Sequence, residues 1–143
     1  GVAALEARIR ASEAQHSGEI RVCVEAGLPP ALVWRGTPPR QRALQWFAQL
    51  GVWDTEANNG VLVYLLLADH AVEIVADRDV ARRVAPDHWQ RVADAMLPAL
   101  RGGRFADALA QAVDAVHEVL VAHYALPAGA RSVNELPDTV VLA

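Results

Sequence analysis

The fold is decided by the stretch NNGVLVYLLLADHAVEIVAD, residues 58–77. Within it, residues 61–67 are continuously apolar, which is typical of a central strand that is covered on both faces. A tight polar turn, Ala68-Asp69-His70, separates this run from a second apolar run at 72–76, so we predict an antiparallel hairpin. The turn signal Asn58-Asn59-Gly60 marks where the first strand of the hairpin begins.

A further strand is expected upstream of the hairpin. Residues 19–26 alternate in polarity with a period of two, which predicts a strand covered mainly on one face. Its apolar positions are Ile20, Val22 and Val24, and the positions between them are Arg21, Cys23 and Glu25. Helical spacing of Leu44, Phe47 and Leu50 then predicts a helix before the hairpin. This order implies a right-handed crossover with parallel pairing of the two strands.

Three other segments have the period of amphipathic helices that pack on a sheet. They are 2–15, where Leu5, Ile9 and Ser12 share a face, 86–100, which Gly102-Gly103 closes, and 104–124. The proline-rich stretch 27–39 is predicted to be an exposed loop. Together these elements predict an α/β fold, a mixed β-sheet of three to four strands sandwiched between helices. We assign residues 1–126 to this domain and 127–143 to an extended C-terminal tail.

Composition excludes several classes of protein. Hydrophobic residues make up 53% of the 143-residue chain and charged residues 21%, as in one globular domain. The formal net charge of −4 provides no basic field for a phosphate backbone, so we expect no nucleic-acid partner. All 13 basic residues are arginine, which excludes Schiff bases and phosphate-loop lysines. The single cysteine, Cys23, allows neither an intrachain disulfide nor a cysteine-rich zinc site.

The sequence contains no segment that would place the chain in a membrane. Its longest apolar run, 61–68, is far shorter than the roughly 20 residues that a membrane-spanning helix needs. No signal peptide precedes Gly1, although the abrupt helical start is compatible with an upstream segment having been removed. We expect a cytoplasmic or membrane-associated protein, with any membrane contact made through a segment not present in this chain.

Familiar catalytic patterns are absent from the sequence. Pro29 stands six residues after Cys23, where a cysteine phosphatase needs arginine. Neither Ser12, Ser17 nor Ser132 lies in a Gly-x-Ser-x-Gly turn. The five histidines show no metal-ligand spacing, so we predict structural or surface roles for them.

A set of short motifs, taken in order, resembles a known family. They are Ser17-Gly18-Glu19-Ile20-Arg21-Val22, Asn59-Gly60-Val61-Leu62-Val63, Asp69, the strand end Ile74 to Asp77, Trp89, Met96, Gly103-Arg104-Phe105 and the tail Asn134-Glu135-Leu136-Pro137-Asp138. From about Leu5 to Tyr124 the chain resembles the TPM domain family, in particular its short bacterial members. The resemblance implies a mixed sheet between helices. The family includes a thylakoid-lumen acid phosphatase, photosystem-repair proteins and membrane-associated proteins without known activity.

The resemblance also implies a site for calcium or a similar cation at acidic loops at one end of the sheet, and here the chain departs from the pattern. Asn58 stands where phosphatase-like members have aspartate, and Ala81 stands where they have glutamate. The remaining candidates for a calcium or magnesium site are Asp77, Asp79, Asp69 and Asn58.

The same acids have a second interpretation. Asp77 can cap a short helix, with Asp79 in its favourable first turn and Arg82 and Arg83 nearby, and we favour this structural role.

Exposed aromatic residues are the candidates for a partner-binding surface. Trp34 with Arg35 lies in the proline-rich loop, and Trp53 follows the second helix. A tryptophan tucked over its own loop is the alternative for Trp34.

We therefore expect a domain without a complete catalytic site, acting as a binding or accessory domain in bacterial envelope or membrane-associated processes. It would meet a protein partner through the loops after the first and third strands. The alternative is a calcium- or magnesium-dependent acid phosphatase in which Asp77, Asp79 and Asp69 hold the ion and a metal-bound water attacks the ester.

Overall fold

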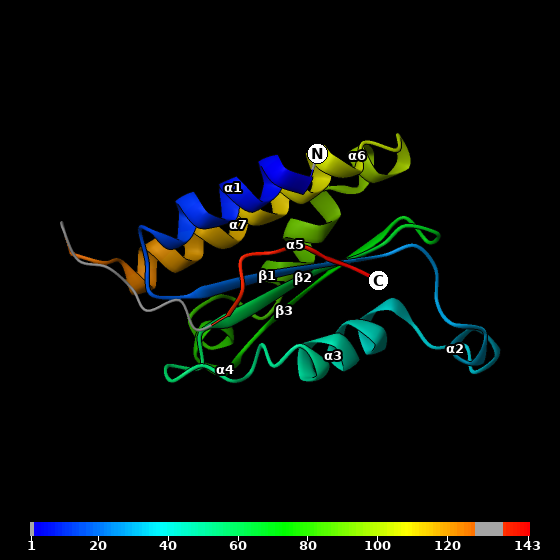
Figure 1. Cartoon of the computed structure of the whole chain (residues 1–143), viewed down its shortest axis with the longest axis horizontal. Coiled ribbons are helices and arrows are strands. Elements are labelled where there is room, and N and C mark those ends of the chain that lie inside the picture. Colours follow the sequence, from blue (N-terminus) through cyan, green and yellow to red (C-terminus); the bar gives the residue numbers. More distant parts are fainter. Residues whose placement is uncertain (1, 128–135) are drawn as a thin grey trace.

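The chain folds as a sheet between two layers of helices, as Figure 1 shows. The computed structural model describes residues 2–127 and 136–143. The described elements are α1 (Val2–Glu13), β1 (Glu19–Glu25), α2 (Pro30–Trp34), α3 (Pro39–Gln49), β2 (Gly60–Leu66), β3 (Ala71–Ala76), α4 (Arg78–Ala81), α5 (His88–Ala95), α6 (Leu97–Arg101), α7 (Phe105–Tyr124) and β4 (Val141–Leu142). The α/β class is confirmed.

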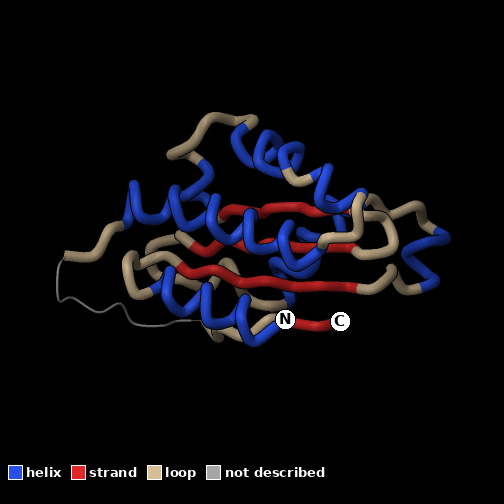
Figure 2. Tube along the Cα trace, turned by 90° about the horizontal axis from the view of Figure 1, so that it is seen from above, coloured by secondary structure: helices blue, strands red, loops and turns tan. Residues whose placement is uncertain are grey.

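The sheet has four described strands in the order β3-β2-β1-β4, which lie side by side in Figure 2. Strands β1 and β2 are parallel, with Val22 opposite Val63, and β3 pairs with β2 in antiparallel direction. The predicted parallel pairing of β1 with β2 and the predicted hairpin are therefore confirmed. The strand β4 comes from the predicted tail and pairs in parallel with β1. Residues 128–135 of that tail lie outside the described residues.

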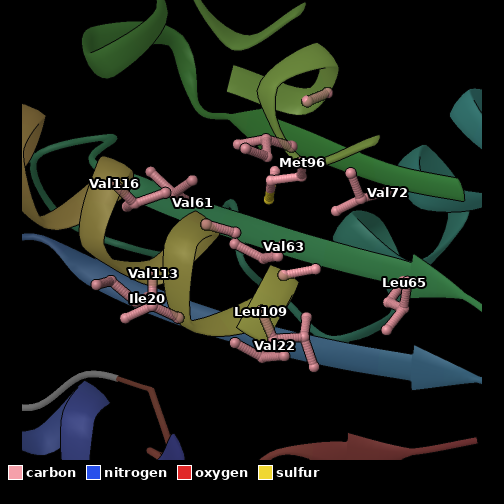
Figure 3. Packing of buried hydrophobic residues seen from close by; sticks show 14 of the residues in the cluster. Ile20, Val22, Val61, Val63, Leu65, Val72, Met96, Leu109, Val113 and Val116 are labelled. Carbon is pink, nitrogen blue, oxygen red and sulfur yellow. The ribbon is translucent and has the colours of Figure 1, made fainter. Parts of the chain in front are cut away.

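One face of the sheet carries the larger hydrophobic core. Helices α1, α5, α6 and α7 cover this face, with α1 and α7 lying side by side (Figure 1). In Figure 3, Val113 and Val116 of α7 lie over Ile20 of β1 and Val61 of β2, all of which are fully buried. Burial of this apolar surface is the main force that holds the two layers together.

The other face of β1 is also buried, so the prediction that β1 is covered mainly on one face is wrong. Helix α3 and the tail cover it, and the strand compensates its polar side chains with hydrogen bonds. The Glu25 carboxylate accepts hydrogen bonds from Arg42 Nε at 2.9 Å and from the Tyr64 hydroxyl at 2.7 Å. Arg21 Nη1 donates to the carbonyl of Pro137 at 3.0 Å. The polar positions of β1 are thus internal partners for α3 and the tail.

Two helical predictions need correction. The segment predicted as one helix over 86–100 forms α5 and α6, which meet at Met96, because Pro98 in the first turn of α6 has no backbone N–H to continue the ladder. The stretch 27–39 is exposed for the most part but contains the short helix α2, which starts at Pro30. In the described part of the chain, every helix is too short or too polar to cross a lipid bilayer.

Candidate functional site

The antiparallel hairpin brings three of the predicted site residues to one end of the sheet. The end of β3 lies beside the start of β2, where Asp77 N donates to the Gly60 carbonyl at 2.9 Å. One step further, Asp79 N donates to the Asn58 carbonyl at 3.1 Å. Asn58, Asp77 and Asp79 therefore lie close together, at the end of the sheet where the phosphatase-like pattern places its acids.

The fourth predicted ligand, Asp69, is not part of this group. It lies in the turn between β2 and β3, at the far end of a seven-residue strand, which corresponds to about 20 Å. One ion cannot contact Asp69 and Asp77 at the same time. Among the described residues, no group of three or more His, Cys, Asp or Glu side chains is placed to hold a metal ion.

The side chain of Asp79 is engaged by three partners. Oδ2 accepts from Arg83 Nε at 2.9 Å and from the Tyr124 hydroxyl, and Oδ1 accepts from Arg82 Nη2. The hydrogen bond from Tyr124, followed by that from Arg83, lowers the pKa of Asp79 to about 2. A divalent cation would have to displace these donors before it reached either oxygen.

Asp77 caps the helix α4, which confirms the structural role that we favoured for it. Its Oδ1 accepts a hydrogen bond from Arg78 N at 2.8 Å, and Asp79 lies in the first turn of the same helix. The second oxygen of Asp77, Oδ2, is buried and has no hydrogen-bond partner among the described residues. One oxygen of Asp77 is thus available to a further donor or a cation.

The turn before β2 is fixed by close backbone contacts. Asn59 N donates to Thr55 Oγ1 at 3.1 Å, and Asn59 Nδ2 donates to the Ser17 carbonyl at 3.3 Å. A Cβ on Gly60 would lie 2.2 Å from the carbonyl oxygen of Val52, so only glycine fits there. Asn59 Oδ1 is buried without a partner among the described residues. Together with Asp77 Oδ2 it gives two buried side-chain oxygens without a partner among the described residues, whereas calcium takes six to eight oxygen ligands in all.

Two polar clusters were missed by sequence reasoning. In the first, Ser12 Oγ lies 2.9 Å from His16 Nε2 and 2.7 Å from His117 Nδ1. Burial, with a contribution from nearby His117, lowers the pKa of His16 to about 4. Ser12 of α1 and His16, just after the end of that helix, are four residues apart in the sequence, a visible signal. The approach of His117 depends on the packing of α1 against α7. Ser12 is 5% exposed and cannot meet a substrate, so the cluster is structural.

The second cluster joins Glu13 of α1 and Glu19 of β1 to Asp138 of the tail. Burial of Glu13, reinforced by hydrogen bonds with Asp138 and Glu19, raises the pKa of Glu13 to about 11. Its Oε2 also accepts from the backbone N–H of Ile20 at 2.8 Å. The surroundings of Glu13 therefore favour its protonated form, and its side chain links the helix layer to the tail.

The predicted partner-binding residues do not form one surface. Trp34 is 90% exposed and its neighbour Val33 63% exposed, with Arg35 also exposed beside them. Trp53 is 54% exposed, and its Nε1 donates to the Ala48 carbonyl at 3.2 Å. The 11-residue helix α3, about 17 Å long, runs between Trp34 and Trp53. The exposed indole of Trp34 excludes the tucked alternative.

The protein is an α/β sandwich domain, because its four-stranded mixed sheet has helices on both faces. An Asn-Gly turn lies beside the aspartate-capped helix α4 at one end of the sheet. The model of the TPM domain matches residues 1–119, so the chain belongs to the TPM domain family.

Solved structures that are similar to the chain include two determined by NMR. The NMR structure of BA42 protein from the psychrophilic bacterium Bizionia argentinensis is 25% identical, with a TM-score of 0.83 over 99% of this chain and 92% of that chain. The solution structure of the N-terminal domain of a protein from P. gingivalis is also 25% identical, with a TM-score of 0.66 over 85% of this chain and 76% of that chain. No curated protein sequence matches the chain at a significant level.

Proposed function

We propose that this TPM domain is a non-catalytic binding domain that meets a protein partner through the loop around α2. The observation that carries the proposal is the indole of Trp34, which is 90% exposed beside the 63% exposed side chain of Val33. Tryptophan is enriched among residues that dominate binding energy at protein interfaces, because it buries a large apolar area and also donates a hydrogen bond. Arg35 adds a guanidinium that can pair with a carboxylate of the partner.

The state of the acidic residues supports the non-catalytic part of the proposal. Both oxygens of Asp79 accept hydrogen bonds from Arg82, Arg83 or Tyr124, and one oxygen of Asp77 caps α4. Each carboxylate therefore stabilises the local structure around α4. The calcium or magnesium ion that the resemblance implies fits these residues poorly.

The geometry narrows the surface that a partner would use. The loop after β1 leads into α2, while the loop after β3 begins at Asp77, beside the start of β1 and β2. These two loops lie at opposite ends of the sheet, so the proposed surface comprises the α2 loop alone. The membrane-associated members of the family support a setting at the bacterial envelope for this binding role.

Site-specific photo-crosslinking tests the proposal. A photoreactive phenylalanine analogue at position 34 should capture a protein in cells that express the chain natively, and the same analogue at Ala122, an exposed position of α7, should not. Added wild-type domain should compete for the adduct, whereas the Trp34→Ala domain should compete at least tenfold less well. Equal competition by both domains would contradict the proposal.

A metal-dependent phosphomonoesterase is the second candidate. It is favoured by the two buried oxygens without a partner among the described residues, Asp77 Oδ2 and Asn59 Oδ1. Calorimetric titration with calcium and magnesium, together with a phosphate-ester assay, distinguishes the candidates when it is applied to wild type and Asp77→Asn. Asparagine also caps helices well, so this variant should keep α4. Metal-dependent turnover that Asp77→Asn abolishes would overturn the binding-domain proposal.

A further inference from the structure

An apolar cavity of about 370 Å³ is lined by residues of α1 and α7. These two helices lie on the side of the sheet away from α3 (Figure 1). Val24 of β1 and Leu65 of β2 line it from the sheet, and Leu5 and Leu109 line it from the helices. Leu142 of the tail, which is 67% exposed, lies at the rim. The volume is within the range of roughly 300–1,000 Å³ that is usual for small-molecule sites.

Small side chains on the facing helices create this space. Ala4 of α1 and Ala106 and Ala110 of α7 line the cavity, where larger side chains would fill the space. Protein interiors have few voids larger than a water molecule, because an unfilled apolar wall loses its dispersion contacts. The arrangement therefore leaves apolar surface that a ligand can cover.

The lining has one charged side chain, Arg8. Its Nη1 donates to Asp114 Oδ1 at 2.8 Å and to Oδ2 at 3.0 Å, a pair in which both side chains are about half exposed, at 48% and 56%. Such exposed pairs contribute little to stability. A guanidinium carries five N–H donors, and Arg8 uses only Nη1 within the described residues. Donors for an anionic headgroup are thus available at an otherwise apolar cavity.

We propose that this cavity binds a free medium-chain fatty acid, with the hydrocarbon chain between α1 and α7 and the carboxylate on Arg8. Charge complementarity with the guanidinium selects an anionic headgroup. The volume corresponds to about twelve water-sized units, which an unbranched chain of about eight to twelve carbons fills. This site is separate from the α2 surface of the proposed function and does not depend on it.

Calorimetric titration of the complete protein with octanoate, decanoate and dodecanoate, each below its micelle concentration, tests the proposal. Affinity should rise by up to about fourfold for each added methylene and stop rising once the cavity is full. Decanol, which has the same chain without the charge, should bind about tenfold more weakly than decanoate. Absence of saturable binding, or equal affinities for decanoate and decanol, would overturn the proposal.

Two variants test separately the part of the site that holds the hydrocarbon chain of the ligand and the part that holds its carboxylate. Ala110→Leu fills the cavity and should weaken decanoate binding at least tenfold, whereas Ala122→Leu, an exposed position of the same helix, should leave it unchanged. Arg8→Gln should weaken decanoate about tenfold and leave decanol unchanged. Thermal melts followed by circular dichroism check that each variant is folded, and unchanged decanoate affinity in folded Ala110→Leu would overturn the proposal.

Two other occupants of the cavity give distinct results. Sedimentation would show a dimer of the ligand-free chain that Ala110→Leu dissociates if a second copy covered the cavity. Vesicles of anionic phospholipid would bind the chain, with free decanoate neither binding nor competing, if the surface served a membrane instead. Either result would overturn the fatty-acid proposal.

Discussion

Arg40 of α3 donates a hydrogen bond from Nη1 to the backbone carbonyl of Ile74 in β3, at 2.7 Å. Strand β3 is at the edge of the sheet, where backbone groups that lack a neighbouring strand can pair with another chain. The guanidinium covers one of these groups and also lies 3.9 Å from Glu73. A charged residue on α3 thus protects an edge strand.

Loss of this contact should be measurable. We expect Arg40→Met to lower the free energy of unfolding by about 1 kcal/mol and to increase self-association, because the Ile74 carbonyl becomes open to another strand. Urea unfolding and sedimentation measure the two effects. Arg10→Met, at an exposed position of α1, is the control and should change neither. Equal behaviour of the two variants would rule out a protective role for Arg40.

The Asn-Gly turn should not tolerate a side chain at Gly60. An added Cβ would lie 2.2 Å from the Val52 carbonyl, so we expect Gly60→Ala to lower the free energy of unfolding by about 3 kcal/mol. At Gly27 the nearest contact of an added Cβ is Ala68 Cβ at 3.9 Å, an ordinary distance. Gly27→Ala should therefore be neutral or slightly stabilising in the same urea experiment. A mild effect at Gly60 would mean that the turn can rearrange.

The buried His16 should make the fold sensitive to acid. Its folded-state pKa of about 4 lies below the unfolded value of 6.5, so the stability that it contributes is present above 6.5 and is lost as pH falls toward 4. The loss is on the order of 3 kcal/mol, since each pKa unit corresponds to about 1.4 kcal/mol. His16→Gln should flatten unfolding free energy against pH in this window, and exposed His123→Gln should not. An unchanged slope in His16→Gln would contradict the assignment.

Glu13 should act in the opposite direction. Its folded-state pKa of about 11 lies above the ordinary value of 4.5, so the stability that the protonated form contributes is complete below 4.5 and declines as pH rises. Glutamine resembles the protonated carboxyl, so we expect Glu13→Gln to be more stable than wild type at pH 8, by on the order of 2 kcal/mol. Urea unfolding at pH 5 and pH 8 measures the difference. The assignment fails if the variant gains nothing at pH 8 relative to pH 5.

Tyr124 should control the acidity of Asp79. The tyrosine hydroxyl is the first cause of the low pKa of Asp79, about 2, so Tyr124→Phe should raise that pKa toward its ordinary value of 3.8. A carbon-detected NMR titration of the Asp79 carboxyl measures the change. Phenylalanine keeps the ring that stacks 5.2 Å from the Arg83 guanidinium, so the packing should be retained. A shift no larger than that in Trp34→Phe, a control in α2 at the opposite end of the sheet, would assign the low pKa to the arginines alone.

Much of the fold could be predicted because its strands and helices have clear periods. The run 61–67 and the alternation of Ile20 and Val22 gave the two central strands within one residue of their observed ends. The break at Met96 was missed because the apolar stripe continues through it, while the effect of Pro98 is a local backbone effect. Strand β4 has two residues, too few to show a period, and exists only because β1 offers an edge.

The candidate site was predictable only where it follows from the hairpin. Antiparallel pairing alone places Asn58 beside Asp77, and the same pairing places Asp69 at the other end, which the sequence reasoning overlooked. The hydrogen bond from Tyr124 to Asp79 joins residues 45 positions apart through the packing of α7. No local sequence pattern indicates such a contact, so the hydrogen bond of Asp79 with Tyr124 could be found only in the structure.

The tail contact has a consequence for the order of folding. Arg21 and Thr139, which lie 118 residues apart, are joined by a hydrogen bond next to the short pairing of β4 with β1. Closing so long a stretch of chain is entropically costly, so we expect the hydrogen bond and the pairing of β4 with β1 to form after the helices and the hairpin. Until then the outer edge of β1 is a template for other unfolded molecules, and dilute refolding should give higher recovery than concentrated refolding.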